Sequence, residues 1–390
     1  MKIAKIFFGT PNNPKGYFNN VIERTKHLMD NEPNVDCYMI RRSHPLLVRL
    51  IKERQLRLND SQPEYTIVDN IHFKNIWISP GVIDYIIANR LNLRLVQNKK
   101  HLVKHLEQFK DYDLISSHGE EANYLAMIIN KKFAIPYVTT WHGSDINIRP
   151  FKSPFLKIQV RKILNGAYHN FFVSEKLLET SRKISKGKNK STLYTGPSES
   201  FVKYSSSDKQ LLRQKLGIHS KYVVGFIGNF ESIKNVMVLP DIFKKIQKNV
   251  DQVSFVLVGN GSLGNELQNQ IQSTAIRDVY FLGRKAPSDM PDIMNCLDLL
   301  ILPSLNEGMP RAILEALACG VPVVGSNRGG IPEVLSNNNT FELDNKFVEE
   351  ISQRAIEILT TDNLKVKLPE KFSWDHAVAQ ELKVYNDALS

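Results

Sequence analysis

PSLNEGMPRAILEALACGVPVVGSNRGGIPE, residues 303–333, is the stretch of the sequence that decides the fold. It begins at the end of the apolar run LLILP and contains a second such run, VPVVG, with a helical pattern between the two. Short apolar strands joined by helices are typical of a parallel sheet that is covered on both faces. Gly329 and Gly330 then mark another tight turn from a strand to a helix.

The same alternation of strand and helix patterns extends over the rest of the chain. In the second half, YVVGFIG, VSFVLVG and VYFLG precede these two runs, and helical patterns fit residues 233–249, 287–297, 309–319 and 346–360. The first half has strand patterns in KIAKIFF, VDCYMI, DLISS, PYVTTW and NFFVS, edge-like strands in YTIVDNIHFKNIWIS, and a basic helical pattern over residues 82–109. We predict an α/β protein of two doubly wound, Rossmann-like domains that face each other across a cleft, with the ligand at the carboxyl ends of the strands.

The domain boundary is expected in TLYTGPSESFVKYSSSD, which is rich in Ser, Gly and Pro and has no periodicity. We place the linker near residues 196–208, the first domain over residues 1–200 and the second over residues 201–373. Residues 374–390 read as a terminal helix.

Composition excludes several classes of protein. The 390 residues are 42% hydrophobic and 23% charged, which is ordinary for a folded soluble protein. The longest apolar runs are far shorter than the roughly twenty residues that a membrane-spanning helix needs. The N-terminus MKIAKIFFGT lacks a secretory cleavage site, and three distant cysteines form no disulfide framework. We therefore expect a cytoplasmic protein.

Charge is divided unevenly between the two halves. Residues 1–200 contain 31 Lys and Arg against 18 Asp and Glu, whereas the remainder contains 20 against 22. An anionic membrane surface, a phosphate-bearing acceptor or a solvated lysine-rich surface each explains this excess. Nucleic acid is disfavoured because no RNP1-like or zinc-finger pattern occurs. We expect residues 41–57 and 94–104 to bind the inner face of the cytoplasmic membrane.

The candidate binding residues lie where LLILP gives way to the helical pattern. The amides of Gly308 and Met309 are expected at a helix N-terminus, which is a natural site for an anion or a hydroxyl group. Glu307 lies in the turn, and Glu315 follows eight residues later on an otherwise apolar helix. A carboxylate accepts hydrogen bonds from two vicinal sugar hydroxyls. The pattern therefore indicates a sugar or sugar-nucleotide site.

Residues 307–324 resemble the signature EGxPxxxLEAxAxGxPVV of retaining GT-B nucleotide-sugar glycosyltransferases of family 4. The resemblance implies that Glu315 binds the donor ribose, while Glu307 and the amides that follow hold the donor sugar. VGFIGNFESIKN, residues 224–235, stands where the family carries a GR-x4-K phosphate motif. Lys234 matches the lysine, and Asn229 replaces the arginine.

Further segments extend the resemblance over the whole chain. FLGRK, with Arg284 and Lys285, resembles the segment whose backbone meets the nucleobase. WHGSD resembles the histidine loop, which implies that His142 lies beside the transferred sugar. TPNNPKGYFNNV resembles the glycine loop, with Gly16 close to the diphosphate, and the segment that contains residues 374–390 resembles the terminal segment that returns to the first domain.

The resemblance implies a metal-independent transferase without a cofactor, in which the departing phosphate itself helps to deprotonate the acceptor. Asp111 and Asp113 form a D-x-D pair, the metal motif of the other large glycosyltransferase fold, but they precede a strand and the remaining chain does not fit that fold. We expect transfer of a hexosyl or N-acetylhexosaminyl group, with UDP favoured, to a glycan or lipid-linked acceptor in bacterial surface-polysaccharide assembly. A sugar-nucleotide epimerase of the same fold and a non-catalytic sugar-nucleotide binder remain alternatives.

Overall fold

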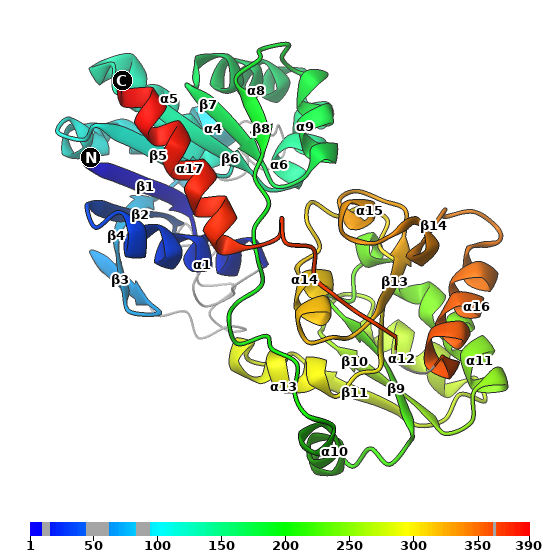
Figure 1. Cartoon of the computed structure of the whole chain (residues 1–390). Helices are drawn as coiled ribbons and strands as arrows, with labels where there is room; N and C mark the ends of the chain where they lie inside the picture. The colour runs from blue at the N-terminus through cyan, green and yellow to red at the C-terminus, as the bar shows by residue number, and fades with distance from the viewer. Residues whose placement is uncertain (10–15, 44–61, 83–93, 362–363) are drawn as a thin grey trace. The chain divides into compact units, whose positions relative to one another are not determined.

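The computed structural model describes residues 1–9, 16–43, 62–82, 94–361 and 364–390 (Figure 1). The chain divides into two compact units. Unit 1 combines Met1–Thr195 with Trp374–Ser390, and unit 2 is Gly196–Ser373. The division falls after Thr195, somewhat before the expected residue 200, and the terminal helix belongs to unit 1.

Unit 1 contains an eight-stranded sheet in the order β3-β4-β2-β1-β5-β6-β7-β8. All neighbours are parallel except β3 and β4, which form the expected edge as an antiparallel hairpin. The strands are β1 (Ile3–Phe8), β2 (Val35–Arg42), β3 (Tyr65–Val68), β4 (Ile71–Ile78), β5 (Leu114–His118), β6 (Tyr137–Trp141), β7 (His169–Phe172) and β8 (Lys190–Thr192).

Helices connect these strands and cover the sheet. Helix α1 packs against the terminal helix α17, while α5 packs against α8. Of the helix expected over residues 82–109, residues 83–93 lie outside the described residues, and the remainder is α4 followed by the 3-10 segment η1. The helices of unit 1 are α1 (Gly16–Asn31), α4 (Arg94–Leu102), η1 (Val103–Phe109), α5 (Glu120–Phe133), α6 (Ser144–Asn147), α7 (Arg149–Lys152), α8 (Pro154–Gly166), α9 (Glu175–Arg182) and α17 (Trp374–Leu389).

Unit 2 contains a six-stranded parallel sheet in the order β11-β10-β9-β12-β13-β14. Helices α13 and α14 lie on one face, and α11 and α16 lie on the other (Figure 1). The strands are β9 (Tyr222–Ile227), β10 (Val253–Val258), β11 (Val279–Gly283), β12 (Leu299–Leu302), β13 (Val323–Ser326) and β14 (Thr340–Phe341). The helical segments are α10 (Ser206–Lys215), η2 (Ser232–Lys234), η3 (Val236–Val238), α11 (Leu239–Asn249), α12 (Gly264–Gln272), η4 (Pro287–Asp289), α13 (Met290–Asn295), α14 (Arg311–Ala318), α15 (Ile331–Val334), η5 (Asn337–Asn339) and α16 (Phe347–Thr360). The predicted α/β class with two Rossmann-like domains is confirmed.

Three expected boundaries in unit 2 were wrong for local reasons. The linker ends earlier than residue 208, because the Ser205 hydroxyl accepts a hydrogen bond from the Asp208 amide and so caps the start of α10. The helix expected from residue 233 begins at Leu239, because Asn235 adopts a left-handed φ of 53°. The helix expected from residue 309 begins at Arg311, because Pro310 disfavours helical geometry in the residue before it.

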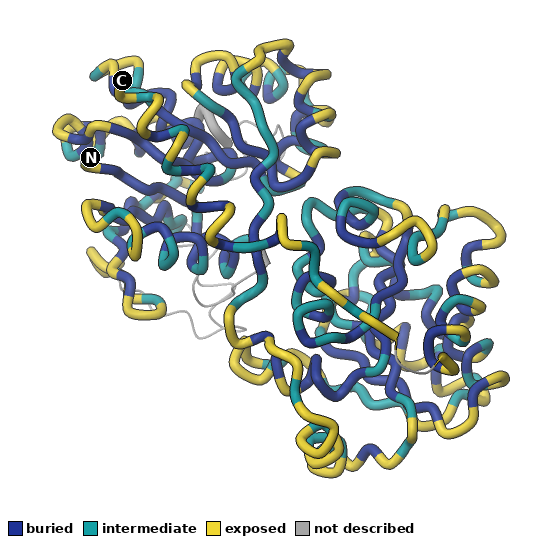
Figure 2. The backbone as a smooth tube through the Cα atoms, in the orientation of Figure 1, coloured by how far each residue is buried: buried dark blue, intermediate teal, exposed yellow. Residues whose placement is uncertain are grey.

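In both units the central strands of the sheet are the most deeply buried. The central strands are dark throughout in Figure 2, and every residue of β5, β6, β10, β12 and β13 is buried. The three cysteines are free and buried, as their isolated positions predicted. Within the described ranges, no helix combines the length and the apolarity that crossing a bilayer requires.

Strand order locates the ligand-binding edge of each unit separately. In unit 1 the chain proceeds from β1 to β2 on one side and later to β5 on the other, so the order reverses between β1 and β5. In unit 2 the same reversal falls between β9 and β12. Open parallel sheets bind ligands at the carboxyl ends of the strands that flank such a switch point.

A buried charge network attaches the terminal helix to unit 1. Glu381 on α17 accepts hydrogen bonds from Arg24 Nε at 2.6 Å and from Lys5 Nζ at 3.5 Å, and all three side chains are buried. Tyr385 also donates to Glu381 or, at 2.6 Å, to Ser116 Oγ of β5. A lysine inside the apolar run KIAKIFF is the sequence signal of this network, because a buried cation requires a partner.

Candidate active site

The switch point of unit 2 contains an ion pair between two of the predicted residues. Lys234, the last residue of η2 after β9, donates from Nζ to Glu307 Oε1 at 2.5 Å, and Glu307 follows β12. Ser304 Oγ donates to the same carboxylate oxygen at 2.9 Å. The two loops are also joined by a hydrogen bond of 2.9 Å from the Leu305 amide to the Ile233 carbonyl. Residues 73 positions apart thus form one charged site.

The turn that carries Glu307 packs tightly against the glycine pair that the sequence singled out. A Cβ on Gly329 would lie 2.1 Å from the Glu307 carbonyl oxygen, and one on Gly330 would lie 2.3 Å from the Gly308 carbonyl oxygen. The Gly330 amide donates to the Glu307 carbonyl at 3.2 Å. Gly329 also has a φ of 60°, in the left-handed region. Side chains at either position would displace the Glu307 turn.

Glu315 lies on α14 and pairs with Arg311 one turn earlier, with an Nε–Oε1 distance of 3.3 Å. Both side chains are mostly buried, and Nη1 of Arg311 is buried without a hydrogen-bond partner. Gly308 and Met309 lie in the turn before α14, so the prediction that their amides begin the helix was wrong. Sequence reasoning missed the contact between Arg311 and Glu315.

The remaining predicted residues of unit 2 also lie at the carboxyl ends of strands. Asn229 follows β9 and is exposed. Its backbone carbonyl accepts a hydrogen bond of 2.9 Å from the amide of Glu231. Arg284 and Lys285 follow β11, which is separated from β9 by β10. They share the sheet edge of the Lys234–Glu307 pair.

The switch point of unit 1 is formed by two histidines and a tyrosine. His118 ends β5 and His142 follows β6, and their Nδ1 and Nε2 atoms lie 3.3 Å apart. Tyr17, in the first turn of α1, stacks edge-on against His142 with ring centroids 4.6 Å apart. Its hydroxyl donates to the His118 carbonyl at 2.7 Å. Tyr17 was missed, although it directly follows the predicted Gly16, which begins α1.

Both histidines are uncharged at neutral pH. Burial, followed by the charges of Arg24 and Lys5, lowers the pKa of His142 to about 3. Burial and the same two cations also lower the pKa of His118 well below its usual value. A neutral imidazole can hydrogen-bond a sugar hydroxyl, but it cannot supply a proton as a strong acid.

The His142 loop is held in place by acidic groups that sequence reasoning did not single out. The Asp145 carboxylate accepts hydrogen bonds from the backbone amides of His142 and Gly143, the latter at 2.7 Å. Arg149 forms an ion pair with Glu120 at 2.7 Å, which ties α7 to α5. Residues 10–15 of the predicted glycine loop lie outside the described residues.

Asp111 and Asp113, the D-x-D pair, lie at the opposite edge of the sheet, before β5. The Lys2 amide donates to Asp113 Oδ2 at 2.7 Å, and Tyr112 between them is buried and donates to Asp36 at 2.5 Å. In the described part of the chain, no three His, Cys, Asp or Glu side chains are grouped to hold a metal ion. Asp111 and Asp113 are both exposed.

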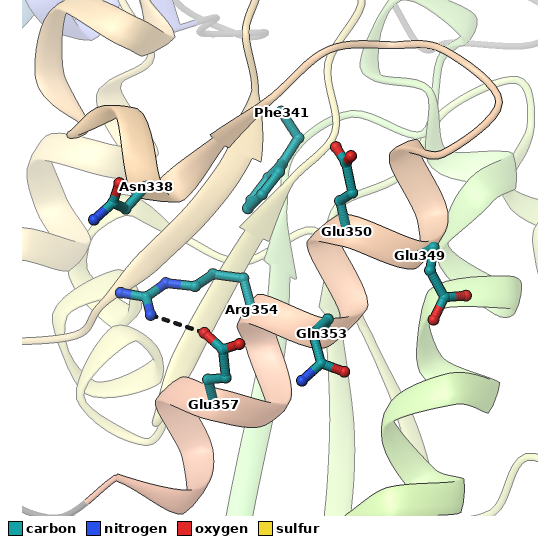
Figure 3. Close-up of a pocket in the computed structure, with 7 residues that line it drawn as sticks. All are labelled: Asn338, Phe341, Glu349, Glu350, Gln353, Arg354 and Glu357. Carbon is teal, nitrogen blue, oxygen red and sulfur yellow. Dashed lines mark hydrogen bonds and ion pairs between the residues drawn. The ribbon is translucent and has the colours of Figure 1, made fainter.

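An open pocket of about 500 Å³ lies between β14 and α16 in unit 2 (Figure 3). Its wall contains an ion pair between Arg354 and Glu357 at 3.0 Å. None of the predicted site residues lines it. The lining residues are Asn338, Phe341, Glu349, Glu350, Gln353, Arg354 and Glu357.

Two protein families match this chain. Residues 38–192 match Glycosyltransferase Family 4, and residues 208–373 match Glycosyl transferases group 1. A relative from Bacillus anthracis, N-acetyl-alpha-D-glucosaminyl L-malate synthase, is 30% identical over 267 residues, which are 65% of this chain and 68% of the relative. The fold and these matches define a GT-B glycosyltransferase. The chain belongs to glycosyltransferase family 4.

Other relatives and solved structures agree with this class. The Campylobacter jejuni N,N'-diacetylbacillosaminyl-diphospho-undecaprenol alpha-1,3-N-acetylgalactosaminyltransferase is 26% identical and covers 88% of this chain and 94% of its own. The structure of Anabaena HepE in complex with UDP superposes with a TM-score of 0.69 at 20% identity and covers 99% of this chain and all of its own. This likeness confirms the fold.

Proposed function

We propose that this glycosyltransferase moves a hexosyl or N-acetylhexosaminyl group from a UDP-sugar, with retention of configuration, to a glycan or lipid-linked acceptor in bacterial surface-polysaccharide assembly. The observation that carries the proposal is the Lys234–Glu307 ion pair at the switch point of unit 2. Relatives act on undecaprenol-diphosphate sugars in Campylobacter jejuni and Escherichia coli, and one is described as a putative teichuronic acid glycosyltransferase. HepE structures hold UDP and UDP-glucose.

Each residue would have a separate role at the donor. Lys234 would face the diphosphate, whose negative charge grows as the glycosidic bond breaks. Glu307 and the amides of Gly308 and Met309 would hold the sugar. Glu315, oriented by Arg311, would accept hydrogen bonds from the two ribose hydroxyls. Because His142 is neutral, it would hydrogen-bond the transferred sugar rather than protonate it.

Glu315→Ala is expected to weaken the binding of UDP. A hydrogen bond to a charged group contributes about 1.5–3 kcal/mol, so the dissociation constant should rise roughly 10- to 100-fold. Isothermal titration calorimetry measures the change. Glu333→Ala, on the short helix α15, is the control carboxylate. An unchanged dissociation constant for Glu315→Ala would remove this residue from the nucleotide site.

Transfer is expected to continue in the presence of EDTA. Lys234 and backbone amides, rather than a divalent cation, would stabilise the leaving diphosphate. The rate is measured with radiolabelled donor before and after chelation. If EDTA abolished transfer and added Mg²⁺ restored it, metal independence would be refuted.

The function itself is tested by supplying UDP-sugars with and without membranes that contain undecaprenol-linked acceptors. Transfer of label to lipid, with the anomeric configuration of the donor kept in the product by NMR, is the expected result. Interconversion of the UDP-sugar without an acceptor would identify an epimerase instead. Binding of UDP-sugar with neither reaction would identify a non-catalytic binder.

A further inference from the structure

One surface of unit 1 combines exposed apolar side chains with basic ones. We call it the α7–α8 face, residues 149–166. Phe151 and Ile158 on this face are 45% and 49% exposed, although large apolar side chains are ordinarily buried. Exposed positions recur along α8 in Figure 2.

Helix α8 is amphipathic, and its outer side is the basic one. It buries Leu156, Val160, Ile163 and Leu164 within unit 1. Ile158, Arg161 and Lys162 are exposed, and their spacing of three to four residues places them on the opposite side of the helix. The apolar Ile158 therefore projects between cations.

No acidic residue neutralises the α7–α8 face from within its own segment. Residues 149–166 contain five Lys and Arg and no Asp or Glu. Arg149 is used internally by Glu120, and Lys157 Nζ lies 5.2 Å from the centroid of the Phe151 ring. Lys152 and Lys162 are exposed and form no ion pair with the described residues. The face therefore presents positive charge around two apolar tips.

We propose that the α7–α8 face docks the protein on a bilayer that contains anionic lipids. Phe151 and Ile158 enter the headgroup layer, and Lys152, Lys157 and Lys162 lie over the lipid phosphates. Apolar insertion combined with Lys and Arg is the pattern of interfacial membrane binding. The proposal rests on the proposed function, because an enzyme with a lipid-linked acceptor has to reach a membrane.

The face is also continuous with the His142 loop. Helix α6 begins at Ser144, directly after the loop, and leads through α7 into α8. The Arg149–Glu120 ion pair attaches the beginning of the face to α5, which follows His118. Docking through α7 and α8 therefore places the His142 loop close to the membrane in the chain. Of the basic segments expected from sequence, residues 44–57 lie outside the described residues.

Sedimentation of the full chain with lipid vesicles tests the proposal. The wild type is expected to bind phosphatidylcholine vesicles that contain phosphatidylglycerol, and to bind pure phosphatidylcholine weakly. High salt should reduce this binding by screening the charges. Lys152→Glu with Lys162→Glu should lower partitioning at least about tenfold. Phe151→Ser with Ile158→Ser should lower it by about tenfold.

Two matched variants in unit 2 serve as controls. Lys244→Glu with Lys248→Glu makes the same charge change on the exposed side of α11, and Leu211→Ser removes a side chain that is 51% exposed on α10. Both should bind vesicles like the wild type, and all variants should melt normally and bind UDP unchanged. Equal losses in the controls, no loss in the α7–α8 variants, or no preference of the wild type for anionic vesicles would overturn the proposal. Anionic-vesicle binding without sugar transfer would contradict only the proposed function.

Discussion

Lys234→Ala is expected to lower the single-turnover rate of sugar transfer by about 10²–10³-fold, the usual cost of removing one preorganised donor to a developing anion. Asn229 can offer the diphosphate only a neutral hydrogen bond, which is about half as strong as a charge-assisted one. Lys234 is also held at 2.5 Å from Glu307, so its ammonium group is positioned before the donor arrives. Because the charge grows in the transition state, the rate should fall more than donor affinity.

Three comparison variants make this result specific to the site. Lys245→Ala removes a lysine that also pairs with a glutamate, Glu349, but at the exposed side of α11, and it should leave the rate unchanged. Asn229→Arg should be tolerated, since it restores the usual family residue. Arg311→Ala should weaken donor binding through Glu315. A loss below about tenfold at Lys234 with a large rate loss at Arg311 would move the phosphate site to α14.

Glu381→Ala is expected to destabilise unit 1 by about 3–5 kcal/mol, because it leaves two buried cations without their shared partner. Lys5 and Arg24 are both buried and both hydrogen-bond to Glu381. Urea unfolding monitored by tryptophan fluorescence reports on unit 1 alone, since Trp77, Trp141 and Trp374 all belong to it. Asp387→Ala, an exposed carboxylate on the same helix, should change the unfolding free energy little.

The same network predicts a loss of stability in acid. Burial raises the pKa of Glu381, but the charges of Arg24 and Lys5 outweigh it and lower the pKa from 4.5 to about 2. The stabilisation is therefore complete above pH 4.5 and declines as the pH falls toward 2. In Glu381→Ala this part of the acid dependence should disappear. An unchanged acid dependence would show that another carboxylate controls it.

Much of the fold and part of the site could be predicted because their signals are local. Apolar runs such as LLILP and VPVVG identify buried strands by their own composition, and the helices between them imply a parallel sheet. The E-x7-E pattern selected Glu307 and Glu315, and Gly329 and Gly330 were recognised by the turn that only glycine permits. The errors lay at helix ends, where Asn235 and Pro310 altered single dihedral angles.

The sequence by itself thus determined the order and kind of the elements and the family of the protein, because each depends on residues within a few turns of one another. Only the tertiary structure decided which charges meet. Lys234 reaches Glu307 across 73 residues, and Lys5 reaches Glu381 across 376. Such pairs depend on strand order and on the docking of α17 against α1, which bring distant segments together. The low pKa of His142 has the same origin, because burial and two cations from other elements produce it.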